Sequence, residues 1–362
     1  MIFISFFTIA AIFTCIQSLL PNTTAALNKF VFSIFSILLI IVVGFRYDSI
    51  DYYAYIDIFH RVSFSEFGFP FYRSVGDTTG NEFIFATVVS IIKALGLNHT
   101  TLFVVVATFS IGIKFYLYSR LQYFWLGCLL FMSFIFFKEL SQIRSMLAGS
   151  FVMLALFLYS SSKGRAGTML LLSSGLIQVF SFSSLFFIFI KKIITPGLFL
   201  VIIGLSFAVA IAYGGIGNLL IYASTFFGAS VSNKVIGYYY GAFNYESISL
   251  NYFNLTSLFF ALYFLIYRMK LGFESSLQDI LIYALAFGVS MYFLFFDFNT
   301  VASRFSDLFI MLSLSFLIPL HLEYQKGLVY RHIVIFGMVI YSSVLFWFNF
   351  SNTPAYSSVL VS

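Results

Sequence analysis

The sequence predicts an all-α fold, a polytopic bundle of about 10–12 transmembrane segments. Of the 362 residues, 61% are hydrophobic and only 9% are Asp, Glu, Lys or Arg, whereas soluble domains contain about 25% charged residues. The mean hydropathy is +1.01, and 52 positions are Phe. This composition excludes a soluble enzyme, a disordered tail and a nucleic-acid-binding protein.

Apolar stretches follow one another along the whole chain. A spanning helix needs about 20 apolar residues, and about twelve segments approach this length. They cover residues 2–20, 29–45, 82–97, 100–118, 121–137, 145–160, 167–190, 197–213, 251–267, 279–296, 303–320 and 333–350. No soluble domain fits between them, so residues 1–362 are predicted to form a single integral membrane domain. The first segment lacks a basic n-region and a clear cleavage site, so it is predicted to be a retained helix rather than a signal peptide.

Two connections are too polar to span and too aromatic to be simple linkers. Residues 46–81 contain five of the thirteen acidic residues, and residues 214–250 are rich in Gly, Tyr, Phe and Asn. We expect both to be extracytoplasmic loops that fold onto the membrane surface, because the other loops are short and basic.

The distribution of Lys and Arg predicts an orientation. Eleven of the nineteen basic residues, Lys114 among them, lie in the cytoplasm if four connections face outward, as the positive-inside rule requires. These connections are residues 46–81, 138–144, 214–250 and 297–303. The arrangement requires that segment 82–97, segment 167–190 or both be re-entrant. It places both termini outside, with about ten full crossings.

Charges at membrane depth are rare and usually functional. The first group is Arg46 with Asp48 and Asp51, where the second segment leaves the membrane. An arginine can bind a phosphate through two parallel hydrogen bonds, and an aspartate can act as a general base. The alternative is an interfacial arginine that pairs with a neighbouring aspartate.

Aromatic residues accompany the charges. Tyr52 and Tyr55 follow Asp51, and Tyr239 lies in the second loop. Their rings are candidates for stacking on sugar, or they belong to the aromatic belt that membrane proteins place at the interface.

Glu82 opens an apolar segment, where an acid is favoured by the helix dipole and is therefore also expected as an ordinary helix start. The stretch KELSQIR contains Lys138, Glu139, Gln142 and Arg144. At a helix start, Arg144 could present its guanidinium to a diphosphate. A short basic loop, even a cytoplasmic one, is the alternative.

Arg304 and Asp307 are three residues apart, so they are neighbours on one helix face, and Asp297 is close in sequence. A structural ion pair is one interpretation, and an anion site is the other. The whole set of arginines, acids and aromatic loops suits an anionic, sugar-bearing lipid. It does not suit a proton or sodium transporter, which needs acids at helix midpoints. A serine protease is also poorly supported. No metal site or cofactor is predicted, because the Cys and His residues lack ligand spacing.

Four stretches occur in an order typical of a known family: VVGFRYDSIDYYAY (42–55), NEFIFATVVSIIKALGLN (81–98), QIRSMLA (142–148) and SRFSDLFIMLSLSFLIPL (303–320). Together they resemble the EpsG-type branch of the Wzy polysaccharide polymerases. The matching residues are Gly44, Phe45, Arg46, Tyr47, Asp51, Tyr52, Tyr55, Glu82, Arg144, Ala148 and Arg304.

The chain departs from this family pattern in several places. The Gly before Asp51 is missing, the spacing from Arg46 to Asp51 is one residue shorter, and Gln142 precedes the arginine instead of following it. Residues 175–187 contain no His, and Gln178 or Ser181 takes its place. No catalytic role is therefore assigned to that segment.

The resemblance implies a glycosyltransferase that joins undecaprenyl-diphosphate-linked oligosaccharide units into O-antigen or a related polysaccharide, at the periplasmic face of the bacterial inner membrane. It implies Asp51 or Glu82 as the base and Arg46, Arg144 and Arg304 as diphosphate ligands, in metal-independent chemistry. Expected partners are the membrane lipid, a chain-length regulator and a flippase, with no nucleic acid. The alternatives are a flippase of lipid-linked oligosaccharide, and an O-antigen ligase or acyltransferase.

Overall fold

The computed structural model describes residues 2–19, 25–47, 49, 51–64, 70–72, 82–240, 250–353 and 356–359. Among these residues the fold is almost entirely helical, with strands of two or three residues. Eight of the described helices are long and apolar enough to cross a membrane, and two shorter apolar helices, Phe83–Ala94 and Phe124–Phe134, accompany them. The predicted all-α polytopic bundle is confirmed.

Contacts group the chain into two compact units. Unit 1 comprises the described residues of Met1–Tyr72, Asn81–Phe182 and Leu314–Ser362, and unit 2 comprises those of Ser183–Ser313. Whether both belong to a single integral membrane domain stays a prediction.

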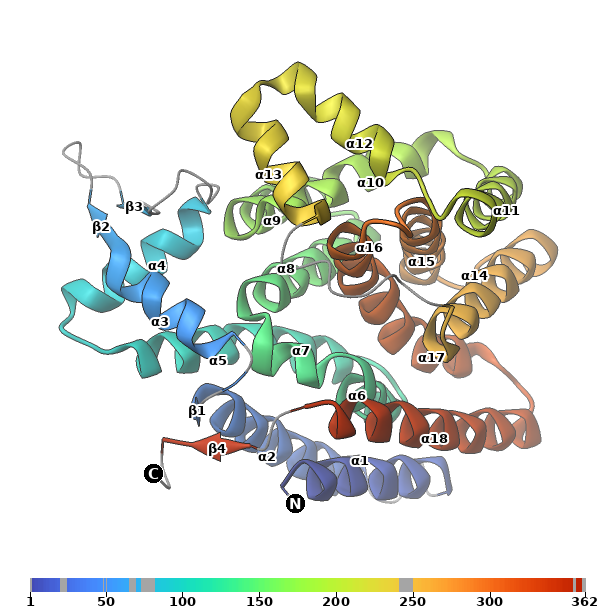
Figure 1. Cartoon of the computed structure of the whole chain (residues 1–362). Coiled ribbons are helices and arrows are strands. Elements are labelled where there is room, and N and C mark those ends of the chain that lie inside the picture. Colours follow the sequence, from blue (N-terminus) through green and yellow to red (C-terminus); the bar gives the residue numbers. More distant parts are fainter. Residues whose placement is uncertain are drawn as a thin grey trace. The chain divides into compact units, whose positions relative to one another are not determined.

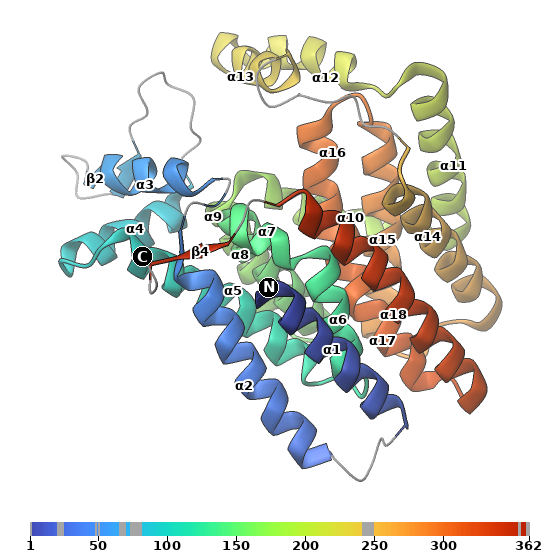
Figure 2. The same ribbon diagram turned by 60° about the horizontal axis from the view of Figure 1, so that its bottom comes forward.

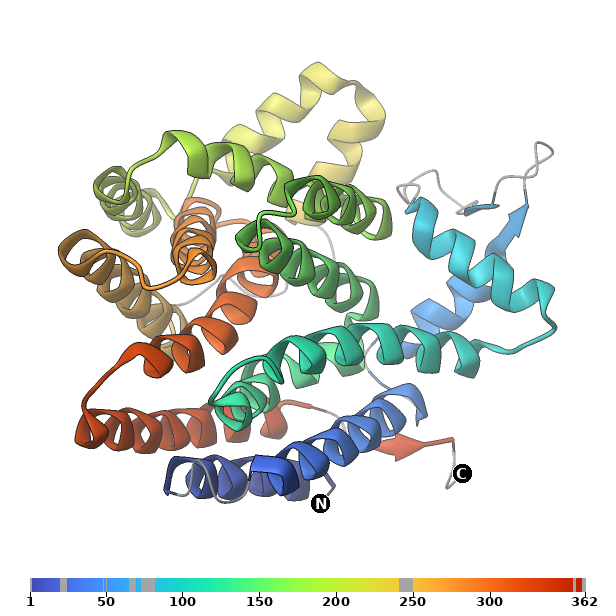
Figure 3. The ribbon, with the colours of Figure 1, turned by 180° about the vertical axis from the view of Figure 1, so that it is seen from behind.

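Unit 1 is built on long helices. They are α1 (Ile2–Leu19), α2 (Ala25–Gly44), α5 (His99–Tyr118), α8 (Ile143–Ser160) and α18 (Leu328–Ser351). Helices α1, α2 and α18 lie side by side (Figures 1 and 3).

One end of unit 1 is fixed by contacts between segments far apart in the sequence. Strand β1 (Arg46–Tyr47) follows α2 and pairs with β4 (Ser357–Ser358), which follows α18. Phe3, near the start of α1, packs edge-to-face on Tyr356. Figure 2 shows α3 (Tyr52–Arg61) and β4 near the end of α2. We call this the Arg46 end. At the opposite end, Gln17 donates to the carbonyl of Gln122 at 2.7 Å.

Two predicted segments are not continuous spans. Helix α4 (Phe83–Ala94) has 12 residues and a length of about 18 Å, against about 30 Å for the hydrocarbon core. Since α2 ends and α5 begins at the Arg46 end, α4 does not cross unit 1. Segment 167–190 is interrupted at Gln178, where α9 (Gly164–Ile177) gives way to η1 (Val179–Phe182) and then to α10 (Ser183–Ile193). Whether either segment is re-entrant stays a prediction.

A third predicted segment, 121–137, is also divided. It forms α6 (Phe124–Phe134) and then α7 (Phe136–Ser141), which runs directly into α8. Next to α4, the short strands β2 (Val62–Phe64) and β3 (Pro70–Tyr72) form an antiparallel pair. These short elements therefore occupy the first of the two predicted loops.

Unit 2 is organised around α15 (Ser276–Leu294), which packs against α11 (Pro196–Tyr213), α14 (Tyr252–Leu271), α16 (Asn299–Phe305) and the π-helical turn η3 (Ser306–Met311). Gly288 lets α15 approach η3, because a Cβ there would lie 2.6 Å from Cβ of Phe309. The second predicted loop contains α12 (Gly217–Ser224), η2 (Thr225–Phe227) and α13 (Ala229–Tyr240). Helix α17 (Leu312–Tyr324) continues from η3.

Helix starts follow the local sequence. The side chains of Asn98, Thr195, Asn251 and Ser275 each accept a hydrogen bond from the backbone N–H three residues later. Such N-caps satisfy one of the donors that a helix start leaves open. In a bundle with little polar surface, these four positions fix where α5, α11, α14 and α15 begin.

A buried ion pair lies inside unit 1. Nζ of Lys114 is 2.7 Å from Oε1 of Glu139, and both side chains are buried. The ammonium also donates to Oγ of Ser150 at 2.6 Å and to the carbonyl of Met146 at 2.9 Å. Oγ of Ser110 donates to both carboxylate oxygens at 2.9 Å. Lys114 was counted among the cytoplasmic basic residues, but it is buried in α5, where Glu139 and these acceptors hold its charge.

We expect Glu139→Gln to lower the free energy of unfolding by about 3–5 kcal/mol, because it leaves the buried ammonium of Lys114 without its counter-charge. The double variant Lys114→Met/Glu139→Gln should recover most of that loss. Denaturation in detergent micelles measures both. Lys163→Met, at an exposed position, is the control, and a single variant as stable as the wild type would contradict the assigned pairing.

Candidate functional site

The Arg46 end is shaped by a close approach of α2 to α5. A Cβ on Gly44 would lie 2.9 Å from Cα of Val104, so a larger residue would force the two helices apart. Beyond Gly44 the chain becomes extended in β1 and then forms α3, whose buried face carries Tyr52, Tyr55 and Phe59. Their spacing of three and four residues places all three on one side of the helix.

Arg46 is buried, with 1% of its surface exposed. Its Nη1 donates to the carbonyl of Val43 at 2.8 Å and its Nε to Oγ of Ser49 at 3.2 Å. The guanidinium carbon lies 4.4 Å from the ring centre of Phe103, within the range of a cation–π contact. Its Nη2 has no hydrogen-bond partner among the described residues.

The charge of Arg46 persists at neutral pH. Burial lowers the pKa of Arg46 to about 10, and the nearby Tyr55, Glu139, Tyr52 and Asp51 oppose that shift. Because this pKa is still well above 7, the guanidinium remains a cation that can donate to an anion.

Arg144 and Glu82 form an ion pair, although 62 positions separate them. Arg144 is the second residue of α8, and Glu82 precedes the first residue of α4. A cation at a helix N-terminus is disfavoured by the helix dipole, and the carboxylate of Glu82 offsets that cost. The Glu82 side chain makes no capping hydrogen bond. Its contact is the ion pair with Arg144, so it does not act simply as the helix-start acid that its position suggested.

The two arginines are linked through aromatic rings. Tyr52 stacks on Phe103 at 5.2 Å, and Tyr55 contacts the same ring edge-to-face at 6.4 Å. The guanidinium of Arg144 lies 5.5 Å from the ring centre of Tyr55. The structure thus brings six predicted residues together, which we call the Arg46–Arg144 cluster: Arg46, Asp51, Tyr52, Tyr55, Glu82 and Arg144.

The two carboxylates of this cluster differ in their surroundings. Asp51 precedes α3, is half-buried and does not cap that helix. Glu82 has 15% of its side chain exposed and is held by Arg144. Asp48, the third acid of the predicted group, lies outside the described residues.

Exposure distinguishes the tyrosines of the cluster from their neighbours. The rings of Tyr52 and Tyr55 are buried, whereas Tyr47 and Tyr53 are exposed. Both exposed rings contact Tyr52 edge-to-face. Sequence reasoning proposed Tyr52 and Tyr55 for stacking without separating buried from exposed rings, although the helical period of α3 could have set these two apart from Tyr53.

The remaining predicted residues belong to unit 2. Arg304 is half-buried near the end of α16, and Asp307 is buried in the π-helical turn that follows. Such turns are frequent at functional sites. Asp297, which precedes α16, accepts hydrogen bonds from the backbone N–H of Gly217 at 2.8 and 2.9 Å and from Oη of Tyr239 at 3.2 Å. Tyr239 therefore has a structural contact besides its predicted role with sugar.

The glycines before α12 make room for this carboxylate. A Cβ on Gly215 would lie 2.3 Å from Oδ1 of Asp297, and φ at Gly215 is +140°. A Cβ on Gly217 would lie 2.8 Å from the same oxygen. Burial and the charge of Asp297 raise the pKa of Tyr239 to about 12, so its hydroxyl stays protonated and continues to donate. The sequence pattern GGIG could have indicated this close approach.

The sequence profile of the EpsG family matches residues 29–361, which is most of the chain. The chain belongs to the EpsG family. This membership confirms the predicted resemblance and supports a polysaccharide polymerase-type function. Together with the long apolar helices, it identifies a multi-pass membrane protein of polysaccharide biosynthesis. No curated protein and no solved structure matches the chain.

Two further features of this EpsG-family chain bear on its chemistry. Gln178, at the interruption between α9 and η1, is buried, and its Oε1 has no hydrogen-bond partner among the described residues. Within the described part of the chain, no group of three or more His, Cys, Asp or Glu residues could hold a metal ion. Metal-independent chemistry stays a prediction.

We expect Gly217→Ala to weaken the attachment of α12 and α13 in unit 2. The added Cβ must displace the carboxylate of Asp297 or the ring of Tyr239, at a cost of about 2 kcal/mol if the charged hydrogen bonds are lost. Limited proteolysis between α11 and α14 should become faster. Gly237→Ala is the matched control, because nothing lies within 4 Å of its Cβ. Equal cleavage of both variants would refute this role of Asp297.

Proposed function

We propose that this EpsG-family protein is a glycosyltransferase that polymerises undecaprenyl-diphosphate-linked oligosaccharide repeat units into O-antigen or a related surface polysaccharide. The observation that carries the proposal is the Arg46–Arg144 cluster, in which two arginines, two acids and several aromatic rings meet at one end of unit 1. These are the groups that a lipid-linked sugar diphosphate needs for binding and reaction.

The reaction forms one bond and breaks another. A hydroxyl at the non-reducing end of the acceptor unit attacks the anomeric carbon of the growing glycan, whose bond to the diphosphate oxygen breaks. The leaving diphosphate gains negative charge, and cationic donors placed there lower the barrier. A base must accept the proton of the attacking hydroxyl.

Arg144 is the stronger candidate for direct contact with the diphosphate. Its side chain is 31% exposed, and a guanidinium can hold two phosphate oxygens at once. Arg46 is buried in the same cluster, with its Nη2 as the remaining donor. We propose that this buried arginine donates a further hydrogen bond to the bound anion through Nη2.

Asp51 leads as the general base and Glu82 follows. Glu82 is already engaged by Arg144, so it would have to release that arginine before it could accept a proton. Asp51 lies within electrostatic range of Arg46, which supports its proposed position near the leaving group. For the sugar, we propose Tyr52 and Tyr55 as supports and the exposed Tyr47 and Tyr53 as the rings that the substrate reaches.

The proposal also includes the localisation of the protein and its partners. The substrate is exported before it is polymerised, so the Arg46 end would face the periplasm and the protein would lie in the bacterial inner membrane. A flippase that supplies lipid-linked units and a regulator of chain length are the expected partners. Arg304 and Tyr239, in unit 2, keep their predicted roles toward diphosphate and sugar, and each can be tested by its own variant.

We expect Arg144→Ala to lower polymerisation by about 100- to 1,000-fold, the usual effect of removing one donor that stabilises developing charge. Arg144→Lys should retain only part of the activity, because lysine offers a point charge without the two-pronged geometry. The length distribution of surface glycan on a gel measures the effect, in strains with equal amounts of protein in the membrane.

Arg165→Ala is the matched control, since Arg165 is exposed in α9 and the predicted orientation would put it on the cytoplasmic side, away from the proposed site. Arg46→Lys and Arg304→Ala extend the test to the other two predicted ligands. A normal ladder from the variants at Arg46, Arg144 and Arg304 would refute the diphosphate site.

Deletion of the protein should leave a core capped by a single repeat unit, because export continues when polymerisation stops. Surface-glycan profiling of the deletion strain measures this. Loss of all repeat units would instead show a transport defect and would favour a flippase over a polymerase.

A further inference from the structure

The C-terminus of helix α2 is held by two side-chain donors. A helix leaves its last carbonyls without partners inside the helix, and Nη1 of Arg46 donates to that of Val43 at 2.8 Å. The preceding carbonyl, that of Val42, accepts a hydrogen bond from Oη of Tyr356 at 2.9 Å, although 314 positions separate the two residues. Arg46 thus lies at a helix C-terminus, where a cation is favoured, and a residue near the end of the chain binds the neighbouring carbonyl.

Residues 356–359, which we call the C-terminal segment, also hold the residue before Arg46. The carbonyl of Phe45 accepts two hydrogen bonds from this segment. The backbone N–H of Val359 donates at 3.0 Å and Oγ of Ser358 at 3.1 Å. Two donors on one carbonyl fix the peptide group from which Arg46 extends.

The residue after Arg46 is held in the same way. Oγ of Ser357 donates to the carbonyl of Tyr47 at 2.7 Å, and β4 pairs with β1 in a register that sets Ser358 opposite Arg46. Successive side chains of a strand point to opposite faces, and Arg46 is buried whereas Tyr47 is exposed. The pairing with β4 therefore keeps the side chain of Arg46 on the inner face of the strand.

Tyr356 connects the C-terminal segment to α1. Its ring packs edge-to-face on Phe3, with ring centres 5.2 Å apart. Burial raises the pKa of its hydroxyl, whereas a hydrogen bond with Ser358 and the charge of Arg46 lower it. The hydroxyl is thus protonated at neutral pH, so it can donate to Val42, and it lies within electrostatic range of the guanidinium.

We propose that the C-terminal segment positions Arg46 for the anion that the Arg46–Arg144 cluster would bind, with Tyr356 and Val359 as positioning residues. This role rests on the proposed function, in which Arg46 donates to a diphosphate through Nη2. Nε and Nη1 are already bonded within the chain, so the direction of Nη2 depends on where β1 lies. A displacement of about 1 Å can cost about 100-fold in rate. Contacts that fix β1 can therefore control polymerisation without touching the substrate.

Two variants remove one donor each from the C-terminal segment. Val359→Pro deletes the N–H that donates to Phe45, and because Val359 is exposed, the change removes no packing from the interior. Tyr356→Phe deletes only the hydroxyl and keeps the ring on Phe3. We expect both variants to shift the surface glycan to shorter chains on a gel, in strains with equal amounts of protein in the membrane.

The position of Arg46 is measured directly by its reaction with phenylglyoxal, which modifies accessible guanidinium groups. The purified full chain is treated in detergent micelles, and mass spectrometry compares the peptide of Arg46 with that of the exposed Arg165. In the wild type we expect Arg46 to react slowly, because 1% of its surface is exposed. Val359→Pro and Tyr356→Phe should each raise its relative rate about five-fold, the effect of one lost hydrogen bond on a local opening.

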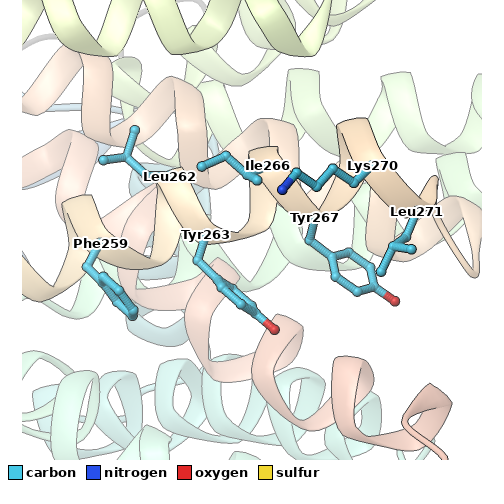
Figure 4. Close-up of a pocket in the computed structure, with 7 residues that line it drawn as sticks. All are labelled: Phe259, Leu262, Tyr263, Ile266, Tyr267, Lys270 and Leu271. Carbon is cyan, nitrogen blue, oxygen red and sulfur yellow. The ribbon is translucent and has the colours of Figure 1, made fainter.

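The matched control for Tyr356→Phe is Tyr267→Phe, on α14 in unit 2 (Figure 4). Tyr267 is half-buried like Tyr356, and its Oη also donates one hydrogen bond, to Glu274 at 3.3 Å. Its removal should leave the glycan ladder and the reactivity of Arg46 unchanged. The conservative variant Val359→Ala keeps the backbone N–H and should restore the slow reaction of Arg46.

A double variant separates the positioning of Arg46 from a general loss of structure. If the C-terminal segment acts through Arg46, Val359→Pro adds little to the shortened ladder of Arg46→Lys, whereas independent effects add. The proposal is overturned if Arg46 reacts as slowly in Val359→Pro and Tyr356→Phe as in the wild type, or if the two ladder defects add. A normal ladder from Arg46→Lys would instead refute the part of Arg46 in the proposed function, and the phenylglyoxal reaction would still decide whether the segment holds Arg46.

Discussion

The requirement that a charge inside an apolar bundle has a partner organises both units. Removing a charged group from water costs several kcal/mol unless a partner compensates it. Within the described residues, Lys114 meets Glu139, Arg144 meets Glu82, and Asp279 meets Lys191 and Arg268. Three of these four pairs join elements that are not consecutive in the chain, whereas Arg268 and Asp279 join the neighbouring helices α14 and α15. The few charges therefore determine which helices come together as well as what the protein can bind.

The fold class could be predicted because it depends on local composition. Apolar stretches of spanning length lie at α1, α2, α5, α11 and α18 largely as expected, and N-caps such as Asn98 and Ser275 set helix starts within a single turn. The places where predicted spans are short or interrupted were harder to predict. Segment 82–97 has the composition of a span, but α4 ends at Ala94, and φ at the following Gly96 is +70°. Whether an apolar helix of this length crosses the bilayer depends on where α2 ends and α5 begins.

Charge pairing was harder to predict, because it depends on contacts across the chain. Lys114 is a basic residue in an apolar segment, and the positive-inside rule counts it on the cytoplasmic side. Only the fold shows that Glu139 lies 2.7 Å from its Nζ. Similarly, Glu82 and Arg144 were singled out separately, and their ion pair became visible only in the structure. The motif order of the family selected several residues that meet at the Arg46 end, but it could not show which of them were buried, or that Asp297 would hold Gly217 and Tyr239.

Burial gives the two arginines of the cluster different capacities. Arg46 is fixed by Val43, Ser49 and Phe103, so little side-chain freedom remains to be lost when it binds an anion. A fixed, partly desolvated cation also acts in a lower dielectric, where each interaction is stronger than in water. Arg144 can move more freely, and Glu82 balances its charge. We propose that an arriving diphosphate competes with Glu82 for Arg144 and releases that carboxylate within the cluster. Binding of the anion would then free Glu82 from its ion pair. The freed carboxylate could accept a proton, as its predicted role of alternative base requires.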